Sequence, residues 1–307
     1  MNEHFYQKTG IVITRLAKDL MQLKKGDRLP IISEYQEQFG IARGTVQNAL
    51  QFLKDKEAIV CESKGHMGTF LTDVNYDLLQ QYALSDDIVG TMPLPYSRLY
   101  EGFATGLYEA FHQRHIRLNM AYVRGSKDRI QSVVNGIYQF TVVSRFAAKE
   151  AAKNKAPITI VQDFGDHTYL SRHIILFAED AKTDVEDGMR VGLDSSSFDQ
   201  QTLTKELTKN KNVTFVEMPG HQLIYALKEG QIDTGVWNYD EIVDKNYQDL
   251  NYRFIEDSQL QRDMSGAVII CQTDNAMYQT ILKKNIDKTA LLEIQKQVVE
   301  GKMIPRY

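Results

Sequence analysis

Cysteine is scarce in this sequence, with only Cys61 and Cys271 in 307 residues. Their wide separation, with no second pair, provides neither a disulfide framework nor the spacing of a zinc site. We expect both thiols to be reduced and to fill space as small apolar side chains.

Long apolar runs are absent as well. No stretch approaches the roughly 18 uncharged apolar residues that a membrane-spanning helix needs, and the segment from Met1 to Tyr6 lacks the pattern of an export signal. Hydrophobic residues make up 43% and charged residues 25%, the balance of a folded, water-soluble protein. The expectation is a cytoplasmic protein without a membrane partner, long enough for two or three folding units.

A large excess of positive charge, which marks a general nucleic-acid binder, is also missing. The net charge is -4, and residues 1–73 carry ten Lys or Arg against nine Asp or Glu. The near balance of this first segment is too weak to identify a DNA-binding domain by itself.

The common catalytic motifs do not occur. There is no G-x-S-x-G, no glycine-rich loop ending in Gly-Lys-Ser/Thr and no H-E-x-x-H. His112 and His115 stand three apart on a predicted helix with a charged surface, and Asp163, Asp166 and His167 fit a polar turn better than a cation site. We predict no catalytic residue, no metal and no cofactor.

The first seventy residues have the pattern of three helices. Ile13, Leu16, Leu20 and Leu23 recur at steps of three and four, which predicts a helix over about 9–23. A second helix is expected from Ser33, whose spacing to Gln36 is that of a capping box, to Gly40. A third helix follows a three-residue turn and buries the apolar positions Val46, Leu50 and Leu53.

An extended pattern follows these helices. Residues 58–62 and 69–72 alternate as two strands around the turn at 64–68. Three helices and a hairpin predict a winged helix-turn-helix over residues 1–73, with the third helix in the major groove and the hairpin beside the DNA backbone.

The run from Leu29-Pro30 through residues 39–50 to 65–70 resembles the winged helix of GntR-type bacterial regulators. Arg43 can fork onto guanine, the Gln47 amide can pair with adenine and Lys64 can neutralise a phosphate. The resemblance implies that the start of the third helix and the tip of the hairpin contact operator DNA, through Arg43, Thr45, Gln47, Lys64, Gly65 and His66.

The sequence departs from the common GntR pattern at three positions. Ala42 replaces a hydroxyl residue at the turn, Gly44 replaces a frequent hydroxyl, and Gln47 replaces a frequent arginine. The cap of the third helix and its phosphate contacts should therefore both be weaker. A helix-turn-helix that contacts protein instead of DNA is the alternative.

From about residue 87, short apolar runs alternate with helical stretches, which is typical of strands joined by crossover helices. The pattern forms two series, and the chain returns to the first with a strand at 267–271. Predicted strands lie at 88–92, 118–123, 139–143, 158–162, 190–193, 213–217 and 234–237, and helices at 98–112, 127–135, 145–152, 200–208, 222–229 and from 276 and 287.

This order and the segment 227–237 are similar to the type 2 periplasmic-binding-protein fold, and residues 92–107 resemble the YhfZ-like branch of GntR-type regulators. The resemblance implies a winged helix-turn-helix (α+β) followed by a two-lobed α/β domain. The predicted bounds are 1–73 for the DNA-binding domain, 74–86 for a linker helix and 87–307 for the effector domain. Lobe I covers about 87–178 and 266–307, and lobe II about 179–265.

Ligands bind such sheets at the carboxyl ends of the strands, where the next helix offers free backbone N–H groups to an anion. Hydroxyl or basic residues occupy four of these junctions, which predicts a pocket for a small anionic effector. The alternative is that each serine only caps its own helix. The predicted ligand-binding residues are Ser97, Arg98, Ser144, Arg145, Ser195, Ser196, Ser197, Trp237 and Asn238.

These features predict a transcription regulator that binds double-stranded operator DNA as a homodimer, and whose affinity for DNA is changed by the effector. A metabolite-converting enzyme or a protein-interaction module with a helix-turn-helix attached is the alternative.

Overall fold

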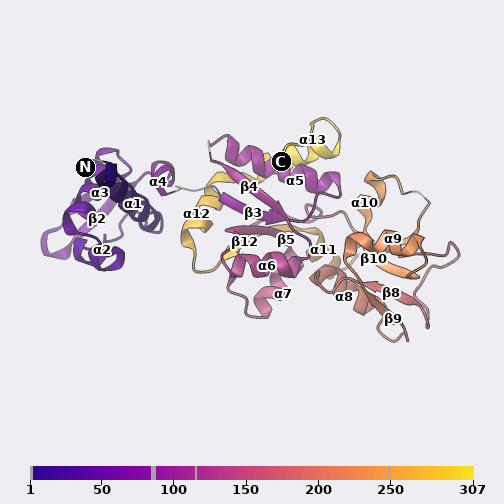
Figure 1. Ribbon diagram of the computed structural model, residues 1–307. Coiled ribbons are helices and arrows are strands. Elements are labelled where there is room, and N and C mark those ends of the chain that lie inside the picture. The colour runs from indigo at the N-terminus through magenta and orange to yellow at the C-terminus, as the bar shows by residue number, and fades with distance from the viewer. Residues whose placement is uncertain (1–2, 84–87, 115, 248) are drawn as a thin grey trace. The chain divides into compact units, whose positions relative to one another are not determined.

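The structure is a computed structural model that describes residues 3–83, 88–114, 116–247 and 249–307. The chain divides into two compact units, which we describe separately (Figure 1). The first consists of Met1–Ile88 with Ala276–Ile281, and the second of Val89–Asn275 with Leu282–Tyr307.

The first unit contains the three helices and the hairpin that the sequence predicts. The apolar side chains of Leu16, Leu20, Val46 and Leu53 are buried where α1 and α3 pack together. The strands of the hairpin are antiparallel, with Ile59 opposite Val74. The elements are α1 (Glu3–Leu20), α2 (Ile32–Phe39), α3 (Arg43–Asp55), β1 (Ile59–Ser63), a 3-10 turn (Gly65–Met67), β2 (Thr69–Val74) and α4 (Tyr76–Ala83).

The start of α2 differs from the predicted capping box. Ser33 lies inside the helix, and the backbone N–H of Ile31 donates to the Glu34 carboxylate at 2.7 Å. The glutamate therefore satisfies the donor at the helix start without a hydroxyl partner. The end of the helix is as predicted, because Gly40 has a φ of 65°, the left-handed conformation that glycine adopts without strain.

Helix α4 covers most of the predicted linker and packs against α1. The Tyr76 hydroxyl donates to the Leu23 carbonyl at 2.8 Å, and Leu79 and Ala83 are buried. The helical part of residues 74–86 thus belongs to the first unit, while residues 84–87 lie outside the described part of the chain.

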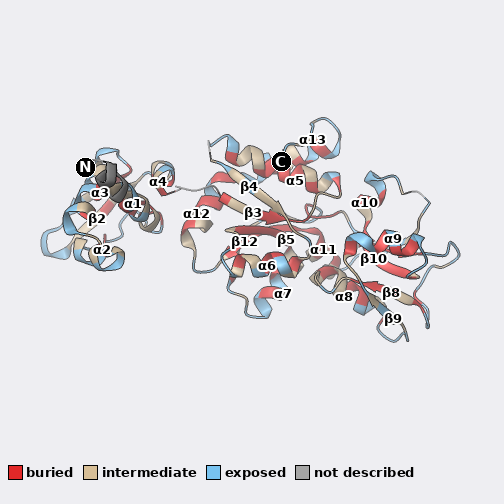
Figure 2. Cartoon of the chain, in the orientation of Figure 1, coloured by how far each residue is buried: buried red, intermediate tan, exposed pale blue. Residues whose placement is uncertain are grey.

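The second unit begins with a five-stranded sheet in the order β4-β3-β5-β12-β6, which we call lobe I. Helices α5 and α13 cover one face of this sheet and α6 and α7 the other (Figure 1). Its central strands β5 and β12 are almost completely buried (Figure 2). Lobe I contains β3 (Ile88–Met92), α5 (Arg98–His112), β4 (Leu118–Tyr122), α6 (Ser126–Val134), β5 (Phe140–Ser144), α7 (Arg145–Lys153), β6 (Ile158–Asp163), β12 (Ala267–Gln272) and α13 (Lys288–Val299). Helix α12 (Ala276–Asn285) is divided, because its residues Ala276–Ile281 are grouped with the first unit and the rest with the second.

Lobe II is a second five-stranded sheet, in the order β11-β7-β10-β8-β9. Its core contains Leu176, Leu223 and Trp237. The elements are β7 (His173–Phe177), β8 (Arg190–Leu193), α8 (Phe198–Leu207), β9 (Thr214–Glu217), a 3-10 turn (Gly220–Gln222), α9 (Leu223–Lys228), β10 (Thr234–Asn238), α10 (Tyr239–Asp244), β11 (Asn251–Phe254) and α11 (Gln259–Ser265).

The boundary between the lobes lies earlier than predicted. Strand β7 pairs with β10 and β11 in the second sheet, so lobe II begins by His173 and not near residue 179. The expected pattern also omitted β7, α10, β11 and α11. Every residue of β7 is buried, which explains why this strand shows no alternation of polar and apolar side chains.

The chain passes between the lobes twice, and the two connecting segments are hydrogen-bonded to each other. The backbone N–H of His167 donates to the Ser265 hydroxyl at 3.1 Å, and that of Tyr169 to the Ser265 carbonyl at 2.8 Å. The N–H of Ala267 donates to the Thr168 hydroxyl at 2.9 Å. The two crossings therefore form one joined connection.

Candidate DNA interface and ligand pocket

One side of α3 is packed into the first unit and the other is open. Val46 and Leu53 are buried, whereas Arg43 and Gln47 are exposed and Thr45 is half-buried. The N-cap residue Ala42 makes no hydrogen bond through its side chain. The first turn of α3 therefore offers backbone N–H groups that a DNA phosphate can accept from, next to side chains suited to base edges.

The tip of the hairpin is also exposed. Lys64, Gly65 and His66 all lie on the surface, and Gly65 has a φ of 58° that favours glycine at this turn. The Lys64 ammonium lies 5.3 Å from the centre of the Phe70 ring, which orients the charge beside the hairpin. The six predicted DNA-contacting residues are thus on two surface elements of one unit.

Two further cations at this surface were not among the predicted residues. Arg28 lies against the hairpin, since a Cβ on Gly68 would be 2.6 Å from the Arg28 Nε atom. Lys54 and Arg43 line a surface hollow between the start of α2 and the start of β2. Both are single basic residues near the ends of elements, and no spacing in the sequence connects them with the recognition helix.

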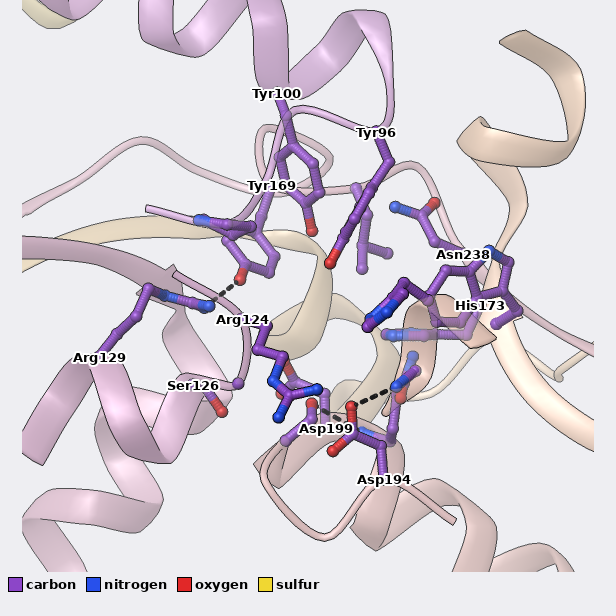
Figure 3. Close-up of a pocket in the computed structure, with 18 residues that line it drawn as sticks. Tyr96, Tyr100, Arg124, Ser126, Arg129, Tyr169, His173, Asp194, Asp199 and Asn238 are labelled. Atoms are coloured by element: carbon purple, nitrogen blue, oxygen red, sulfur yellow. Dashed lines mark hydrogen bonds between the residues drawn. The ribbon is translucent and has the colours of Figure 1, made fainter. Parts of the chain in front are cut away.

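A pocket lies between the two lobes of the second unit (Figure 3). About 630 Å³ of space lies between its walls, and this volume includes space that is open to solvent. Both lobes contribute its wall: Pro93, Tyr96, Tyr100, Arg124, Gly125, Ser126, Arg129, Tyr169, Leu170, His173, Asp194, Ser197, Asp199, Gln200, Gly220, His221, Trp237 and Asn238.

Lobe I contributes basic side chains at the segment between β4 and α6. Arg124 is exposed to the pocket, and Gly125 turns the chain into α6 with a φ of 72°. Arg129, one turn into the helix, is buried and donates to the Val123 carbonyl at 2.8 Å and to the Tyr169 hydroxyl at 2.9 Å. Arg129 therefore holds the wall in place, while the Arg124 guanidinium remains available.

Lobe II contributes a fixed carboxylate at the end of β8. Asp194 accepts hydrogen bonds from the Ser196 N–H at 3.0 Å and hydroxyl at 2.5 Å, and from the Gly220 N–H at 2.8 Å. Gly220 cannot carry a side chain here, because a Cβ would lie 2.7 Å from the Trp237 ring. These contacts hold the Asp194 carboxylate in one orientation at the pocket.

Aromatic rings form the remaining wall. The rings of Tyr96 and Trp237, one from each lobe, have centroids 6.0 Å apart, and those of Tyr100 and Tyr169 are 5.2 Å apart. Burial lowers the pKa of His173 to about 4, although its hydrogen bond with Gln261 opposes the shift, so this imidazole is neutral at pH 7. The pocket thus combines apolar surface with few charges.

The lobes touch each other directly beside the pocket. The Lys127 ammonium donates to the Ser195 carbonyl at 2.6 Å and to the Gln201 side chain at 2.9 Å. The Ser144 hydroxyl of lobe I donates to the buried Asp199 of lobe II at 2.8 Å. Burial raises the pKa of Asp199 to about 7, although the Ser144 hydrogen bond and the charge of Arg129 lower it.

Three of the nine predicted ligand-binding residues, Ser197, Trp237 and Asn238, line the pocket. Ser197 also caps α8, and Asn238 caps α10, so their hydrogen-bonding oxygens are partly engaged. Ser97 and Ser144 cap α5 and α7 outside the pocket, as the alternative interpretation expected.

The remaining predicted residues are not among those that line the pocket. Ser195 is exposed and Ser196 orients Asp194. The exposed Arg98 makes a hydrogen bond from its backbone N–H to Asp244 and does not line the pocket.

Arg145 has a structural role in place of the predicted one. Its guanidinium contacts Asp163 at 2.6 Å, Asp166 at 2.7 Å and Asp263 at 3.5 Å. The hydrogen bond from Arg145 holds the pKa of Asp163 below its ordinary value. The ion cluster joins α7 to the segment after β6 and to α11, and it directs the guanidinium toward three carboxylates, away from the residues that line the pocket.

The main residues that the sequence analysis missed are Arg124, Asp194 and Tyr96. Each of them lies within two residues of a serine at a strand-to-helix junction, and those serines were the signal by which the sequence analysis recognised the junctions. The available signal was the charged residue at the strand end itself, as in Arg124-Gly125-Ser126 and Asp194-Ser195.

The described residues contain no group of three His, Cys, Asp or Glu side chains that could hold a metal ion. His112 stacks on Tyr108 with centroids 5.4 Å apart, and His115 lies outside the described residues. In the same described part of the chain, no helix is both long and apolar enough to span a membrane.

Comparison with known families places both units. Residues 75–307 match the YhfZ C-terminal domain, and residues 24–71 match a helix-turn-helix domain. The chain is 33% identical to the uncharacterized protein YhfZ of Escherichia coli strain K12 over 312 residues, which cover 100% of both chains. The finer resemblance to GntR-type regulators remains a prediction.

Solved structures agree with this assignment. The crystal structure of YhfZ from Shigella flexneri is 31% identical, with a TM-score of 0.61 over 75% of this chain and 97% of that chain. The amino acid ABC transporter substrate-binding protein AbpA from Streptococcus pneumoniae is 16% identical, with a TM-score of 0.50 over 70% of this chain and 94% of that one. The latter similarity shows the fold alone, a two-lobed periplasmic-binding-protein architecture.

Proposed function

This chain belongs to the YhfZ family, and we propose that it is a cytoplasmic transcription regulator whose affinity for operator DNA is set by a small molecule in the pocket of its second unit. The observation that carries the proposal is the pairing, in one chain, of a helix-turn-helix with an open recognition side and a two-lobed domain with a lined pocket.

The proposed DNA contacts divide into base readers and phosphate binders. Arg43 and Gln47 are exposed on α3 and have the hydrogen-bonding groups that read guanine and adenine in the major groove. Lys64 and the additional cation Arg28 lie at the hairpin, where they would neutralise phosphates. Gly65 and His66 complete the contact at the tip of the hairpin.

Regulation requires that the effector favour one arrangement of the protein over another. We propose a homodimer in which two recognition helices reach two half-sites of one operator. Typical couplings between an effector and DNA are about 1 to 3 kcal/mol, which changes operator affinity by about 5- to 150-fold. The available guanidinium of Arg124 supports an effector with an anionic group.

The test is fluorescence anisotropy of the purified full-length protein with labelled DNA from the region upstream of its own gene. Arg43→Ala should weaken binding by about 1 to 3 kcal/mol and relax the preference at one base pair. Arg114→Ala, which removes the same charge from an exposed position in the second unit, is the matched control and should bind as the parent does.

Two results would contradict the proposal. One is an Arg43→Ala protein with unchanged affinity and selectivity, because the recognition side would then not face DNA. The other is chemical turnover of the molecule that co-purifies with the protein, identified by mass spectrometry, because a regulator releases its effector unchanged.

A further inference from the structure

The two walls of the pocket carry opposite charges. Lobe I presents Arg124 at the start of α6, where helix N–H groups also favour an anion. Lobe II presents the carboxylate of Asp194. Figure 3 shows both charged groups and the Tyr96 hydroxyl directed toward the same space. A ligand between the lobes therefore meets a cation on one side and an anion on the other.

Neither charge is neutralised by the other. Among the described residues, Arg124 makes no hydrogen bond and no ion pair within 4.0 Å, although it shares the pocket with Asp194. The second cation of the wall, Arg129, is buried, and its two terminal nitrogens donate to Val123 and Tyr169. Arg124 is thus the pocket cation that remains open to a ligand.

The Asp194 carboxylate is held, but it is not saturated. Its Oδ1 atom accepts from both donors of Ser196, while its Oδ2 atom accepts one hydrogen bond, from Gly220. Each carboxylate oxygen has two acceptor sites, so Oδ2 has one left for a ligand. Because the surrounding backbone fixes the group in place, binding a donor requires no rearrangement of this wall.

The aromatic side chains are consistent with a positive group on the ligand. Tyr96 and Trp237 flank the pocket, and the face of an aromatic ring attracts a cation that lies within about 6 Å. A ligand with anionic groups alone would satisfy Arg124 but would place negative charge beside Asp194, with neutral His173 unable to compensate.

We propose that the pocket binds a zwitterion of the amino-acid class, whose carboxylate pairs with Arg124 and whose ammonium group pairs with Asp194. This inference rests on the proposed function and specifies the effector of that same site. A ligand of this kind bridges the lobes, so its binding favours their closed arrangement, in which both charges are within reach. A simple acid or a simple amine meets only one wall.

The experiment is calorimetric titration of the full-length protein, without DNA, with the twenty standard amino acids in both enantiomeric forms. For each amino acid that binds, the matched acid lacking the amine and the matched amine lacking the carboxylate are titrated next. We expect at least one amino acid to bind, and each of its two truncated analogues to bind about 10- to 100-fold more weakly.

Variants assign the two ends of the ligand. Asp194→Asn should reduce affinity for the amino acid about 10- to 100-fold and leave affinity for the acid analogue within about threefold of the parent. Arg124→Gln should likewise reduce affinity for the amino acid, and it should leave affinity for the amine analogue within about threefold. Asp180→Asn, at an exposed lobe II position outside the pocket, is the control. The comparison of analogues on the parent protein stands even if a variant fails to fold.

The inference is overturned if no amino acid binds, or if the acid analogue binds as well as the amino acid. It is also overturned if Asp194→Asn weakens both ligands equally. DNA binding is measured separately, so a protein that binds its operator but no amino acid refutes this inference alone. A protein that binds an amino acid but no DNA refutes the proposed function alone.

Discussion

Asp199 should make the stability of the second unit depend on pH. This carboxyl is buried at the contact between the lobes, where it accepts a hydrogen bond from the Ser144 hydroxyl. Burial raises its pKa from 3.8 to about 7. Because the folded pKa lies above the unfolded one, the folded state binds the proton more tightly, so the contribution of Asp199 to stability is fully present below pH 3.8 and is lost as the pH rises through about 7.

The size of the effect follows from the two pKa values. Each pKa unit corresponds to about 1.4 kcal/mol, so the full difference between 3.8 and about 7 amounts to about 4 kcal/mol. Of this, about 3 kcal/mol falls between pH 5 and pH 8. Asp199→Asn cannot ionise but keeps an oxygen that accepts from Ser144, so the variant should lose this part of the pH dependence.

Trp237 is the only tryptophan of the sequence and lies in the same pocket, so its fluorescence reports unfolding of this unit. We would measure urea unfolding of the parent and of Asp199→Asn at pH 5 and pH 8. Between these values the parent should lose about 2 to 3 kcal/mol more unfolding free energy than the variant. Asp128→Asn, at an exposed position of α6, should follow the parent. Parallel pH profiles for the parent and Asp199→Asn would refute the reasoning.

Three further predictions concern other parts of the molecule. Gly125→Ala should weaken effector binding by at least about tenfold, because the new Cβ would lie 2.6 Å from the Ser196 hydroxyl of the other lobe and the φ of 72° disfavours alanine. Calorimetry with the co-purifying ligand measures this change, and unchanged affinity would contradict the prediction. Arg145→Met should destabilise the second unit by about 1 to 3 kcal/mol without changing ligand selectivity, because it leaves Asp163 and its neighbouring carboxylates without their common cation. Urea unfolding measures this loss. A stable variant with altered ligand selectivity would show that Arg145 belongs to the ligand site. Lys64→Ala should weaken DNA binding about equally on all sequences and reduce the slope of log affinity against log salt concentration by about one. Fluorescence anisotropy at several salt concentrations measures both effects. A loss that depends on the DNA sequence would show instead that Lys64 contacts bases.

The architecture could be predicted from local patterns wherever one side of an element is buried and the other is open. Leu16 and Leu20 of α1, and Val46 and Leu53 of α3, repeat with the helical period because only one side of each helix meets the core. The strand β7 does not show the alternation of a half-buried strand, since both of its faces are covered. The sheet to which such a strand belongs depends on pairing over a distance, which is why the lobe boundary was misplaced.

The pocket was harder to predict than the fold, because side chains at equivalent strand-to-helix junctions make different contacts in the folded protein. Ser197 and Asn238 reach the pocket, while Arg145, at a junction of the same kind, turns toward three aspartates that come from distant parts of the chain. Local sequence identifies the junctions but not the partners that compete for each side chain. Arg124 could be identified only from the structure, in which none of the described residues pairs with its guanidinium.

The joined connection between the lobes has a mechanical consequence. The segments at residues 167–169 and 265–267 are hydrogen-bonded side by side, so one lobe cannot slide along the other without breaking these bonds. A hinge rotation about the axis of the two segments preserves these hydrogen bonds. In the proposed function, effector binding would therefore be expressed as one variable, the angle between the two lobes.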